Sequence, residues 1–406
     1  MWEVIENGTV TTPKGFVAGA AATGMKHGGA YDVTMIVSDR DCAAAGVFTT
    51  SQVVAAPVIV DQETLAANPS GIRGVVANAK NANACTGQPG IEAAKLMQAQ
   101  AAALLNLKPD QFFIMSTGVI GQQLPLEKIG QGIEICALNL SPNNGSLAAR
   151  AIMTTDTRPK SIGLNVTLSG GDVRIGGIAK GSGMIHPNMA TMLGTITTDA
   201  EIDASTLQEV LGRSNELSFN RISVDGDTST NDTVLLLANG ASGVAVTDDD
   251  LDLFEDALTH VCQQLAQMIV RDGEGAKKFV EIQVEGTSHD ILAHQIANTI
   301  ATSPLVKTAF AGGDANWGRI MAAAGRAGVA FDQHASALWF SSDGENWLQV
   351  LDQGTPTDFE EEASSAIFAE TDIWVRLSVG DDDGEATVWT CDMTHEYITI
   401  NADYRT

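Results

Sequence analysis

The residues best suited to chemistry lie in one short segment, residues 180–193, which reads Lys-Gly-Ser-Gly-Met-Ile-His-Pro-Asn-Met-Ala-Thr-Met-Leu. Its glycines, Gly181 and Gly183, permit backbone angles that other residues cannot reach, and its proline fixes a further angle and disfavours helix at the residue before it. These features predict a rigid, unusual turn. Such a turn could press the hydroxyl of Thr191 against the carbonyl of Ala190, so that the peptide shifts to an ester and then hydrolyses.

A threonine that begins a chain carries both a nucleophile and a base. Its free α-amine has an ordinary pKa of about 7.7–8.0, so near neutral pH it can take the proton of the hydroxyl. Cleavage before Thr191 would therefore make a separate histidine unnecessary. The alternatives are a simple turn or a phosphate-binding loop, although the P-loop pattern G-x-x-x-x-G-K-[ST] is absent from the sequence.

The cysteines offer a weaker case for chemistry. Five of them are scattered along the chain, at positions 42, 85, 136, 262 and 391, without a C-x-x-C pair. This spacing argues against a disulfide framework and against a zinc site. Cys85 lies among polar turn residues, but no histidine is near it in sequence. We expect reduced cysteines and no bound metal.

Length and charge narrow the class of protein. The chain has 406 residues, with 50 acidic and 23 basic side chains and a net charge of −27. This balance disfavours binding to nucleic acid by summed positive charge. The acidic N-terminus is unlike a signal peptide, and no apolar run reaches the roughly 18 residues of a membrane span. The sequence therefore predicts a cytoplasmic protein with neither nucleic acid nor membrane as a partner.

Strand-like runs alternate with alanine-rich helical segments along the whole chain, which predicts an α/β fold. In residues 90–105 apolar side chains recur every three or four positions, as in a helix lying on a sheet. A smaller domain is expected to start after Phe279, with the turn 380–384 as a solvated hairpin connection. Further helices are expected at residues 205–214, 250–271 and 317–327, the last opened by Asn316. Strands are expected at residues 74–78, 112–115, 173–178, 233–238, 337–340, 373–377, 386–390 and 397–400.

The segment 180–193 closely resembles the self-cleavage motif of the ornithine acetyltransferase (ArgJ-type) family of arginine biosynthesis, also called glutamate N-acetyltransferase. The resemblance extends over nearly the whole chain, and the combination of motifs is highly specific. It is carried by residues 77–87, 116–121, 153–157, 219–233, 271–276, 316–320 and 400–406.

The resemblance implies a fold and a division of the chain. The fold would be a four-layer α/β/β/α sandwich of the DmpA/ArgJ type, with a smaller C-terminal α/β domain. Cleavage between Ala190 and Thr191 would give an α chain, residues 1–190, and a β chain, residues 191–406, which remain associated as an α2β2 heterotetramer. Within the β chain, residues 191–280 would complete the core, residues 281–396 would form the C-terminal domain, and residues 397–406 would return to the active site.

The resemblance also implies an activity. The enzyme would move the acetyl group from N2-acetyl-L-ornithine to L-glutamate by a ping-pong mechanism with an acetyl-enzyme intermediate, which divides one amide exchange into two acyl transfers. Acetyl-CoA is expected as a second acetyl donor for glutamate. No bound cofactor is implied, so the expected partners are these small molecules and the two chains of the same precursor.

Particular residues match the functional positions of the family. Thr191 would be the nucleophile, and Thr117 and Gly118 would form the oxyanion hole, where each well-placed donor is worth about 2.7–4 kcal/mol. Glu274 is our candidate for the side-chain ammonium of ornithine. Lys180 is our candidate for a carboxylate contact or for lowering the pKa of the Thr191 amine. The full set of substrate-binding residues would be Thr154, Lys180, Thr191, Glu274, Asn401 and Thr406.

Two stretches depart from the family pattern, and two other functions stay open. Residues 311–316 lack the approach that the family shows before Asn-Trp-Gly-Arg, and residues 339–371 match no family feature. With water as the acceptor, the same threonine would make the protein an amidase or aminopeptidase. A binding protein without catalysis is the alternative from a different class.

Overall fold

The computed structural model describes residues 1–186 and 192–403. Its larger part is built on a sheet with the strand order β1-β6-β7-β8-β10-β3-β4-β5, and β2 pairs with β3. The strands are β1 (Trp2–Val4), β2 (Phe16–Ala21), β3 (Val33–Phe48), β4 (Ile72–Asn78), β5 (Phe112–Ser116), β6 (Lys160–Leu168), β7 (Gly171–Lys180), β8 (Leu193–Thr198) and β10 (Thr233–Ala238).

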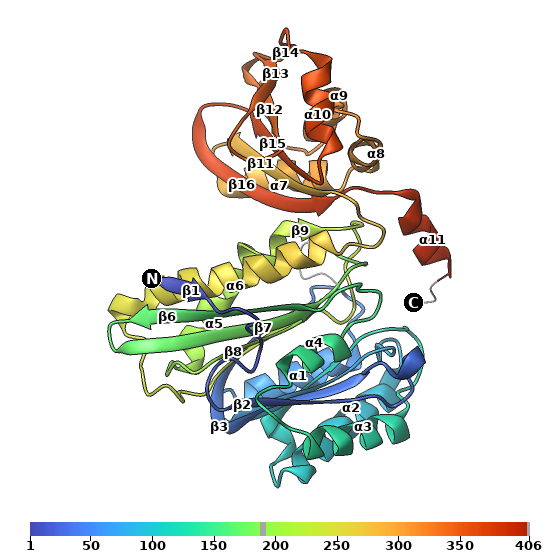
Figure 1. The fold of residues 1–406 in the computed structure, drawn as a ribbon, viewed down its shortest axis with the longest axis vertical. Helices are drawn as coiled ribbons and strands as arrows, with labels where there is room; N and C mark the ends of the chain where they lie inside the picture. Colours follow the sequence, from blue (N-terminus) through green and yellow to red (C-terminus); the bar gives the residue numbers. More distant parts are fainter. Residues whose placement is uncertain (187–191, 404–406) are drawn as a thin grey trace.

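The long strand β3 divides this sheet into two layers. Residues 43–48 of β3 pair with β10, whereas residues 33–38 pair with β2, and β4 pairs with the same early half. The register of β3 against β4 shifts between Val37 and Cys42. One strand therefore serves both halves, which lie one above the other in Figure 1.

Helices cover the two outer faces. The half that contains β6, β7, β8 and β10 packs on α5 (Ala204–Glu216) and α6 (Leu251–Arg271). The other half packs on α1 (Ala56–Ala67), α2 (Gly87–Leu104) and α3 (Leu126–Leu138). The short helix α4 (Gly145–Ala151) joins the core between the layers. The expected α/β/β/α sandwich is confirmed (Figure 1).

The apolar run of β10 shows why this fold suits this sequence. Val234 and Leu236 belong to the core under α5 and α6, while Leu235 and Leu237 belong to the core between the two layers. A strand buried on both faces needs an uninterrupted apolar run rather than an alternating one. The strand predicted at residues 233–238 is found with the same bounds.

The C-terminal part has its own sheet and core. The strand order is β14-β13-β12-β15-β11-β16-β9. On β11, Val280 and Ile282 face the helices that cover this sheet, whereas Glu281 lies on the other face and binds the Trp389 indole. The strands are β9 (Ile222–Ser223), β11 (Phe279–Gly286), β12 (Ala337–Ser341), β13 (Leu348–Asp352), β14 (Thr355–Pro356), β15 (Asp372–Ser378) and β16 (Asp382–Cys391). The helices are α7 (Asp290–Ala301), α8 (Pro304–Gly312), α9 (Trp317–Gly325) and α10 (Glu361–Ala369).

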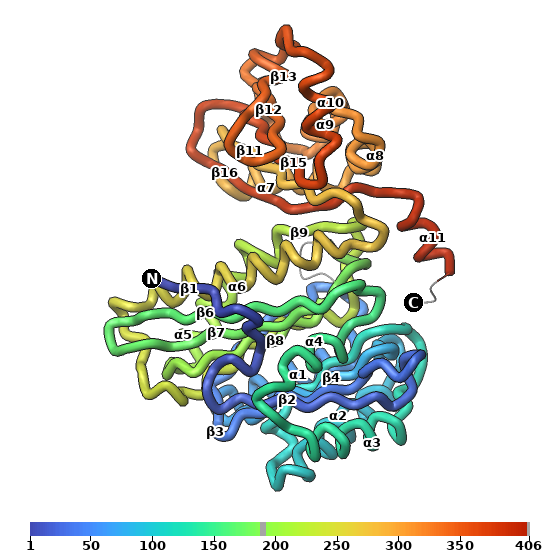
Figure 2. The backbone as a smooth tube through the Cα atoms, in the orientation of Figure 1, coloured from blue at the N-terminus to red at the C-terminus, as the bar shows by residue number. Residues whose placement is uncertain are grey.

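The short strand β9 joins the two parts, because it belongs in sequence to the sandwich and pairs in parallel with β16. The last helix, α11 (His395–Asp403), makes a second connection. Figure 2 shows the chain leaving β16 and returning towards the sandwich, where α11 lies. Short 3-10 helices occupy His27–Gly29, Pro109–Gln111, Phe219–Arg221, Asp248–Asp250 and Gln333–Ala335.

Most predicted elements are confirmed, with ends that differ by a few residues. The helix predicted at 317–327 is α9, and the side chain of Asn316 caps it by accepting the Arg319 N–H at 3.1 Å. Residues 339–371, which carried no family feature, complete β12 and form β13, β14 and α10. None of the helices in the described ranges combines the length and apolarity that a membrane span requires.

Two predictions about local structure were wrong. Residues 397–400 lie inside α11 rather than in a strand, and α11 buries none of its described residues. The turn 380–384 does not connect neighbouring strands, because β15 and β16 flank β11 on opposite sides. The connection instead crosses the end of β11, where a Cβ at Gly286 would overlap the carbonyl oxygen of Gly380.

Candidate active site

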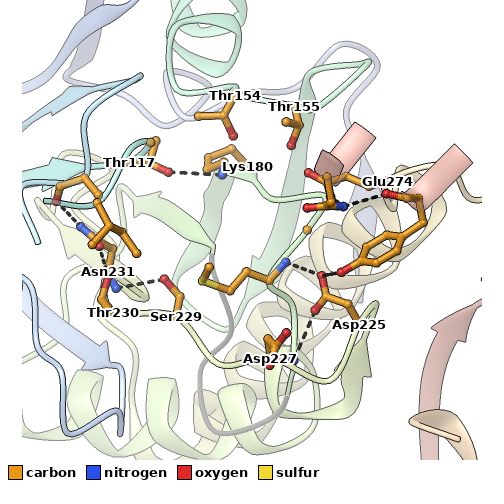
Figure 3. Close-up of a pocket in the computed structure, with 17 residues that line it drawn as sticks. Thr117, Thr154, Thr155, Lys180, Asp225, Asp227, Ser229, Thr230, Asn231 and Glu274 are labelled. Carbon is orange, nitrogen blue, oxygen red and sulfur yellow. Dashed lines mark hydrogen bonds between the residues drawn. The ribbon is translucent and has the colours of Figure 1, made fainter. Parts of the chain in front are cut away.

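Six of the predicted site residues line one cavity of about 240 Å³. They come from separate segments of the chain, namely the ends of β5 and β7, the loop after α4, the loop after α6, and α11. These residues are Thr117, Gly118, Thr154, Lys180, Glu274 and Asn401. Figure 3 shows this cavity, with Thr117, Thr154, Lys180 and Glu274 labelled. The predicted nucleophile Thr191, the cleavage partner Ala190 and the chain end Thr406 lie outside the described residues. The roles of all these residues stay predictions.

Thr117 and Gly118 follow β5 directly. The Thr117 N–H donates to the Asn78 carbonyl at 3.0 Å, which continues the pairing of β5 with β4. Gly118 has φ 134°, and a Cβ there would overlap the backbone of Lys80. Only glycine allows the two loops this approach. The close packing leaves the turn little freedom, as a fixed pair of oxyanion donors would require.

A polar side chain supports this turn from behind. The Asn231 amide donates to the carbonyl of Ala82 at 2.6 Å and to that of Ser116 at 2.9 Å. The loop before β10 is thereby tied to both loops that flank Gly118. Asn231 also lines the cavity. Asn231 belongs to the family motif of residues 219–233, but no role was predicted for it from the sequence.

Lys180 ends β7 and is almost completely buried. Its Nζ donates to Thr117 Oγ1 at 3.4 Å. Burial lowers the pKa of Lys180, although the nearby carboxylate of Asp156 acts in the opposite direction. A buried cation beside the predicted oxyanion turn is suited to stabilise a negative charge that appears in the cavity.

Glu274 approaches the loop after β7 very closely. Its N–H donates to the Ser182 carbonyl at 2.8 Å, and a Cβ on Gly183 would overlap the Glu274 carboxyl group. From α11, the Asn401 amide donates to Glu274 Oε2 at 2.8 Å. A side chain at residue 183 would therefore displace the Glu274 carboxyl group, which lies between the loop after β7 and α11.

Asp232 was missed by the sequence analysis. It is fully buried at the start of β10, and its Oδ1 accepts the Met192 N–H at 3.0 Å, where the described chain resumes. Its Oδ2 has no hydrogen-bond partner in the part of the chain that the structure describes. Burial raises the pKa of Asp232 well above its ordinary value. The only signal in the sequence was its place within the polar run 225–233.

Other cavity residues were also missed as individual site residues. They come from the loop before β10, from the loops after α4 and β7, and from α11, and their contacts cross large sequence separations. These residues are Thr155, Met184, Asp225, Asp227, Ser229, Thr230 and Tyr397. Within the described ranges, no group of three or more His, Cys, Asp or Glu side chains is arranged to hold a metal ion.

Comparison with known proteins extends the resemblance over the whole chain. The model of the ArgJ family matches residues 17–406. A Synechocystis protein named "Arginine biosynthesis bifunctional protein ArgJ" is 45% identical over 421 aligned residues, which span 100% of this chain and 99% of that protein. The protein of the same name from Dehalococcoides mccartyi is 46% identical over 409 residues, spanning 100% and 99%. A crystal structure of the ArgJ protein from Bacillus halodurans is 41% identical with a TM-score of 0.49, covering 52% of this chain and 97% of that one.

Proposed function

Because the chain belongs to the ArgJ family, we propose that it is an acetyltransferase of arginine biosynthesis, which moves the acetyl group from N2-acetyl-L-ornithine to L-glutamate. The observation that carries the proposal is the cavity in which Thr117, Gly118, Lys180 and Glu274 meet. It supplies an oxyanion turn, a buried cation and a carboxylate, which match the acyl group, the carboxylate and the ammonium of such substrates.

The first half of the reaction would load the enzyme. After cleavage, the Thr191 amine takes the proton of the Thr191 hydroxyl, and the oxygen attacks the acetyl carbon of acetylornithine. The negative charge on the carbonyl oxygen is stabilised by the donors of Thr117 and Gly118. The bond from carbon to nitrogen then breaks, and ornithine leaves with the proton. Thr191 retains the acetyl group as an ester.

The second half would regenerate the enzyme. The amine of glutamate attacks the ester carbonyl and the bond to the threonine oxygen breaks. The oxygen recovers a proton, and acetylglutamate leaves. Lys180 would hold a substrate carboxylate, and Glu274 would hold the side-chain ammonium of ornithine. The two substrates thus share one site in turn.

A second acetyl donor is part of the proposal. The relatives named above are called bifunctional, which supports acetyl-CoA as a donor for glutamate on the same threonine. The test supplies acetyl-CoA and glutamate as the only substrates. Formation of acetylglutamate would support the second activity, and its absence would restrict the enzyme to transfer from acetylornithine.

The main test combines the mass of the protein with an assay of transfer. Under denaturing conditions we expect two fragments, one beginning Thr191-Met192-Leu193. Thr191→Ala should remain one chain and transfer no acetyl group. Acetyl release from acetylornithine should require glutamate; release that is indifferent to glutamate would instead identify the amidase or aminopeptidase. The α2β2 assembly and the cytoplasmic location also stay predictions, to be checked by native mass and by cell fractionation.

A further inference from the structure

Asp225 lies between two segments that reach the cavity from different parts of the chain. Its Oδ2 accepts the Met184 N–H at 2.5 Å and the Tyr397 hydroxyl at 3.3 Å. Its Oδ1 accepts the Ile185 N–H at 2.9 Å and the Asp227 N–H at 3.3 Å. Figure 3 shows Asp225 with hydrogen bonds that reach its carboxylate from more than one side. One side chain therefore contacts both the loop after β7 and the helix α11.

The loop after β7 needs such support. Met184 has φ 57°, in the left-handed region that residues other than glycine rarely adopt. Within the described residues, the Met184 and Ile185 N–H groups have Asp225 as their acceptor. The Ile185 carbonyl in turn accepts the Val224 N–H at 2.8 Å, so the loop is paired with the segment that carries Asp225. Residues 184 and 185 shortly precede the predicted cleavage point between residues 190 and 191.

Helix α11 is held by polar groups rather than by a buried apolar face. None of its described residues is buried. Two of its side chains bind the site by hydrogen bonds. Tyr397 donates to Asp225, and Asn401 donates to Glu274. Thr394, just before the helix, donates to the Gly275 carbonyl at 2.7 Å. Because none of the described α11 residues is buried, we expect these polar contacts to have a large share in fixing the helix over the cavity.

We propose that Asp225 is a positioning residue that fixes the Met184–Ile185 backbone for self-cleavage and, through the Tyr397 hydroxyl, fixes α11 over the substrate cavity. The inference deepens the proposed function and rests on it, since cleavage and acetyl transfer are the activities that Asp225 would serve. It assigns Asp225 and Tyr397 a role, and it makes Tyr397 act through Asp225 rather than on the acetyl group.

The chemistry of the contacts requires a carboxylate. The four groups of the described chain that reach Asp225 are all hydrogen donors, and an ionised carboxylate is an acceptor on both oxygens. Asparagine has nearly the same shape, but replaces one oxygen by a donating NH2 group. Asp225→Asn therefore sets donor against donor on one side without leaving a cavity. Tyr397→Phe removes only the contact to α11.

The first test measures hydrogen exchange of the purified full-length protein by mass spectrometry. Asp225→Asn should speed exchange at residues 184 and 185 and in α11 by tenfold or more. Tyr397→Phe should do so in α11 alone. The matched control is Asp203→Asn, because Asp203 also accepts backbone N–H groups, two of them at the start of α5, and does not line the cavity. The control should leave both regions as in the wild type.

The second test measures function. Asp225→Asn should slow self-cleavage at least tenfold in a time course of intact mass, whereas Tyr397→Phe and Asp203→Asn should cleave within twofold of the wild type. In acetyl transfer, Tyr397→Phe should raise KM for the amino-acid substrate severalfold and change kcat less than twofold. In the cleaved fraction of Asp225→Asn, adding Tyr397→Phe should have no further effect on KM.

The outcomes separate this proposal from the proposed function. If the wild type neither cleaves nor transfers acetyl, the proposed function is wrong, while the exchange data still decide whether Asp225 holds the loop and α11. Wild-type exchange at residues 184 and 185 in a folded Asp225→Asn variant would overturn the proposal, as would equal slowing of cleavage by Tyr397→Phe. If Asp225→Asn gives no cooperative thermal transition, Tyr397→Phe decides the proposal, because wild-type exchange in α11 or an unchanged KM in that variant would overturn it.

Discussion

Two buried lysines on neighbouring strands have opposite surroundings. Lys160 begins β6 and Lys180 ends β7, and Lys160 lies beside Ala179 in the register of the two strands. Lys160 Nζ lies 2.7 Å from Asp156 Oδ1 and 2.6 Å from Asp272 Oδ2. Among the described residues, Lys180 has no carboxylate within 4.0 Å and donates only to the Thr117 hydroxyl, at 3.4 Å. The first lysine forms two ion pairs, whereas the carboxylate that acts most strongly on the second, Asp156, lies beyond ion-pair distance.

The difference indicates what each charge is for. A buried cation costs free energy unless it is paired, and Lys160 is paired twice. Asp156 also accepts the Gly181 N–H at 2.8 Å and the Thr154 N–H at 2.9 Å, so the paired cluster fixes the backbone next to Lys180. Lys180 itself faces the cavity. We infer that the cluster of Lys160, Asp156 and Asp272 is structural, whereas the Lys180 ammonium is the group that the proposed function assigns to a substrate carboxylate.

The largest loss of stability is expected from a substitution of Lys160. Lys160→Met removes the buried cation between Asp156 and Asp272 and leaves the two carboxylates close together, with only the exposed Arg158, 3.6 Å from Asp272, as an ion-pair partner. Breaking a buried ion pair from one side typically costs about 3–5 kcal/mol. We expect the free energy of unfolding in urea to fall by about that amount. A loss below about 1 kcal/mol would contradict the structural role of the cluster.

Lys180→Met should show the opposite pattern. It replaces a buried charge that forms no ion pair within 4.0 Å by an apolar side chain of similar length, so the free energy of unfolding should fall much less than in Lys160→Met. Acetyl transfer should fall about 100-fold, which is about 2.7 kcal/mol of transition-state stabilisation. Each lysine variant is the control for the other, because Lys160→Met should mainly lower stability and Lys180→Met should mainly lower acetyl transfer. Loss of stability without loss of transfer in Lys180→Met would contradict the different roles assigned to the two lysines.

The sequence predicted the elements better than the contacts. The run 233–238 has to be a buried strand because it is apolar without interruption, and the alternation of strands and helices predicted the fold class. Residues 397–400 were predicted as a strand, and their sequence, Tyr-Ile-Thr-Ile, consists of residue types that strands favour. Their structure is instead decided by distant partners, since Tyr397 binds Asp225 across 172 positions in the chain. No local pattern contains such a partner.

In the site, too, the residues could be predicted from the sequence and their contacts could not. The motif around residue 180 and the resemblance to the family identified Lys180, Glu274 and Asn401, which the structure brings into one cavity. The different surroundings of Lys180 and Lys160 could not be predicted, because both are single lysines at the ends of strand-like runs. Which carboxylates reach them depends on how β6, β7 and the loop after α6 pack together. That packing also places Gly183 against the Glu274 carboxyl group, a contact that the sequence did not predict.

A smaller effect is expected where the loop of Lys180 meets Glu274. Gly183→Ala places a Cβ against the Glu274 carboxyl group, which must move within the cavity. We expect KM for acetylornithine to rise about tenfold, about 1.4 kcal/mol. The control is Gly212→Ala in α5, where a Cβ meets open space. It should stabilise the protein by up to about 1 kcal/mol and leave KM unchanged. Equal KM values in the two variants would mean that Glu274 does not bind ornithine.

The smallest effect is expected in the stability of the protein at low pH, and it tests whether the ion pairs of Asp156 stabilise the fold. Burial alone would raise the pKa of Asp156, but the positive charges of Lys180 and Lys160 outweigh it and hold this pKa below its ordinary value of 3.8. A carboxyl group with a lowered pKa in the folded state adds stability above its unfolded pKa, and this contribution is lost as the pH falls towards the folded value. We therefore expect the free energy of unfolding of the wild type to decrease below about pH 4, by up to about 1.4 kcal/mol per pH unit from this group. Asp156→Asn cannot release or bind this proton, so its stability should depend less on pH in that range. Parallel curves for the two proteins, measured by urea unfolding between pH 2 and 5, would show that the ion pairs of Asp156 do not stabilise the fold, and Lys160 would then be no better compensated than Lys180.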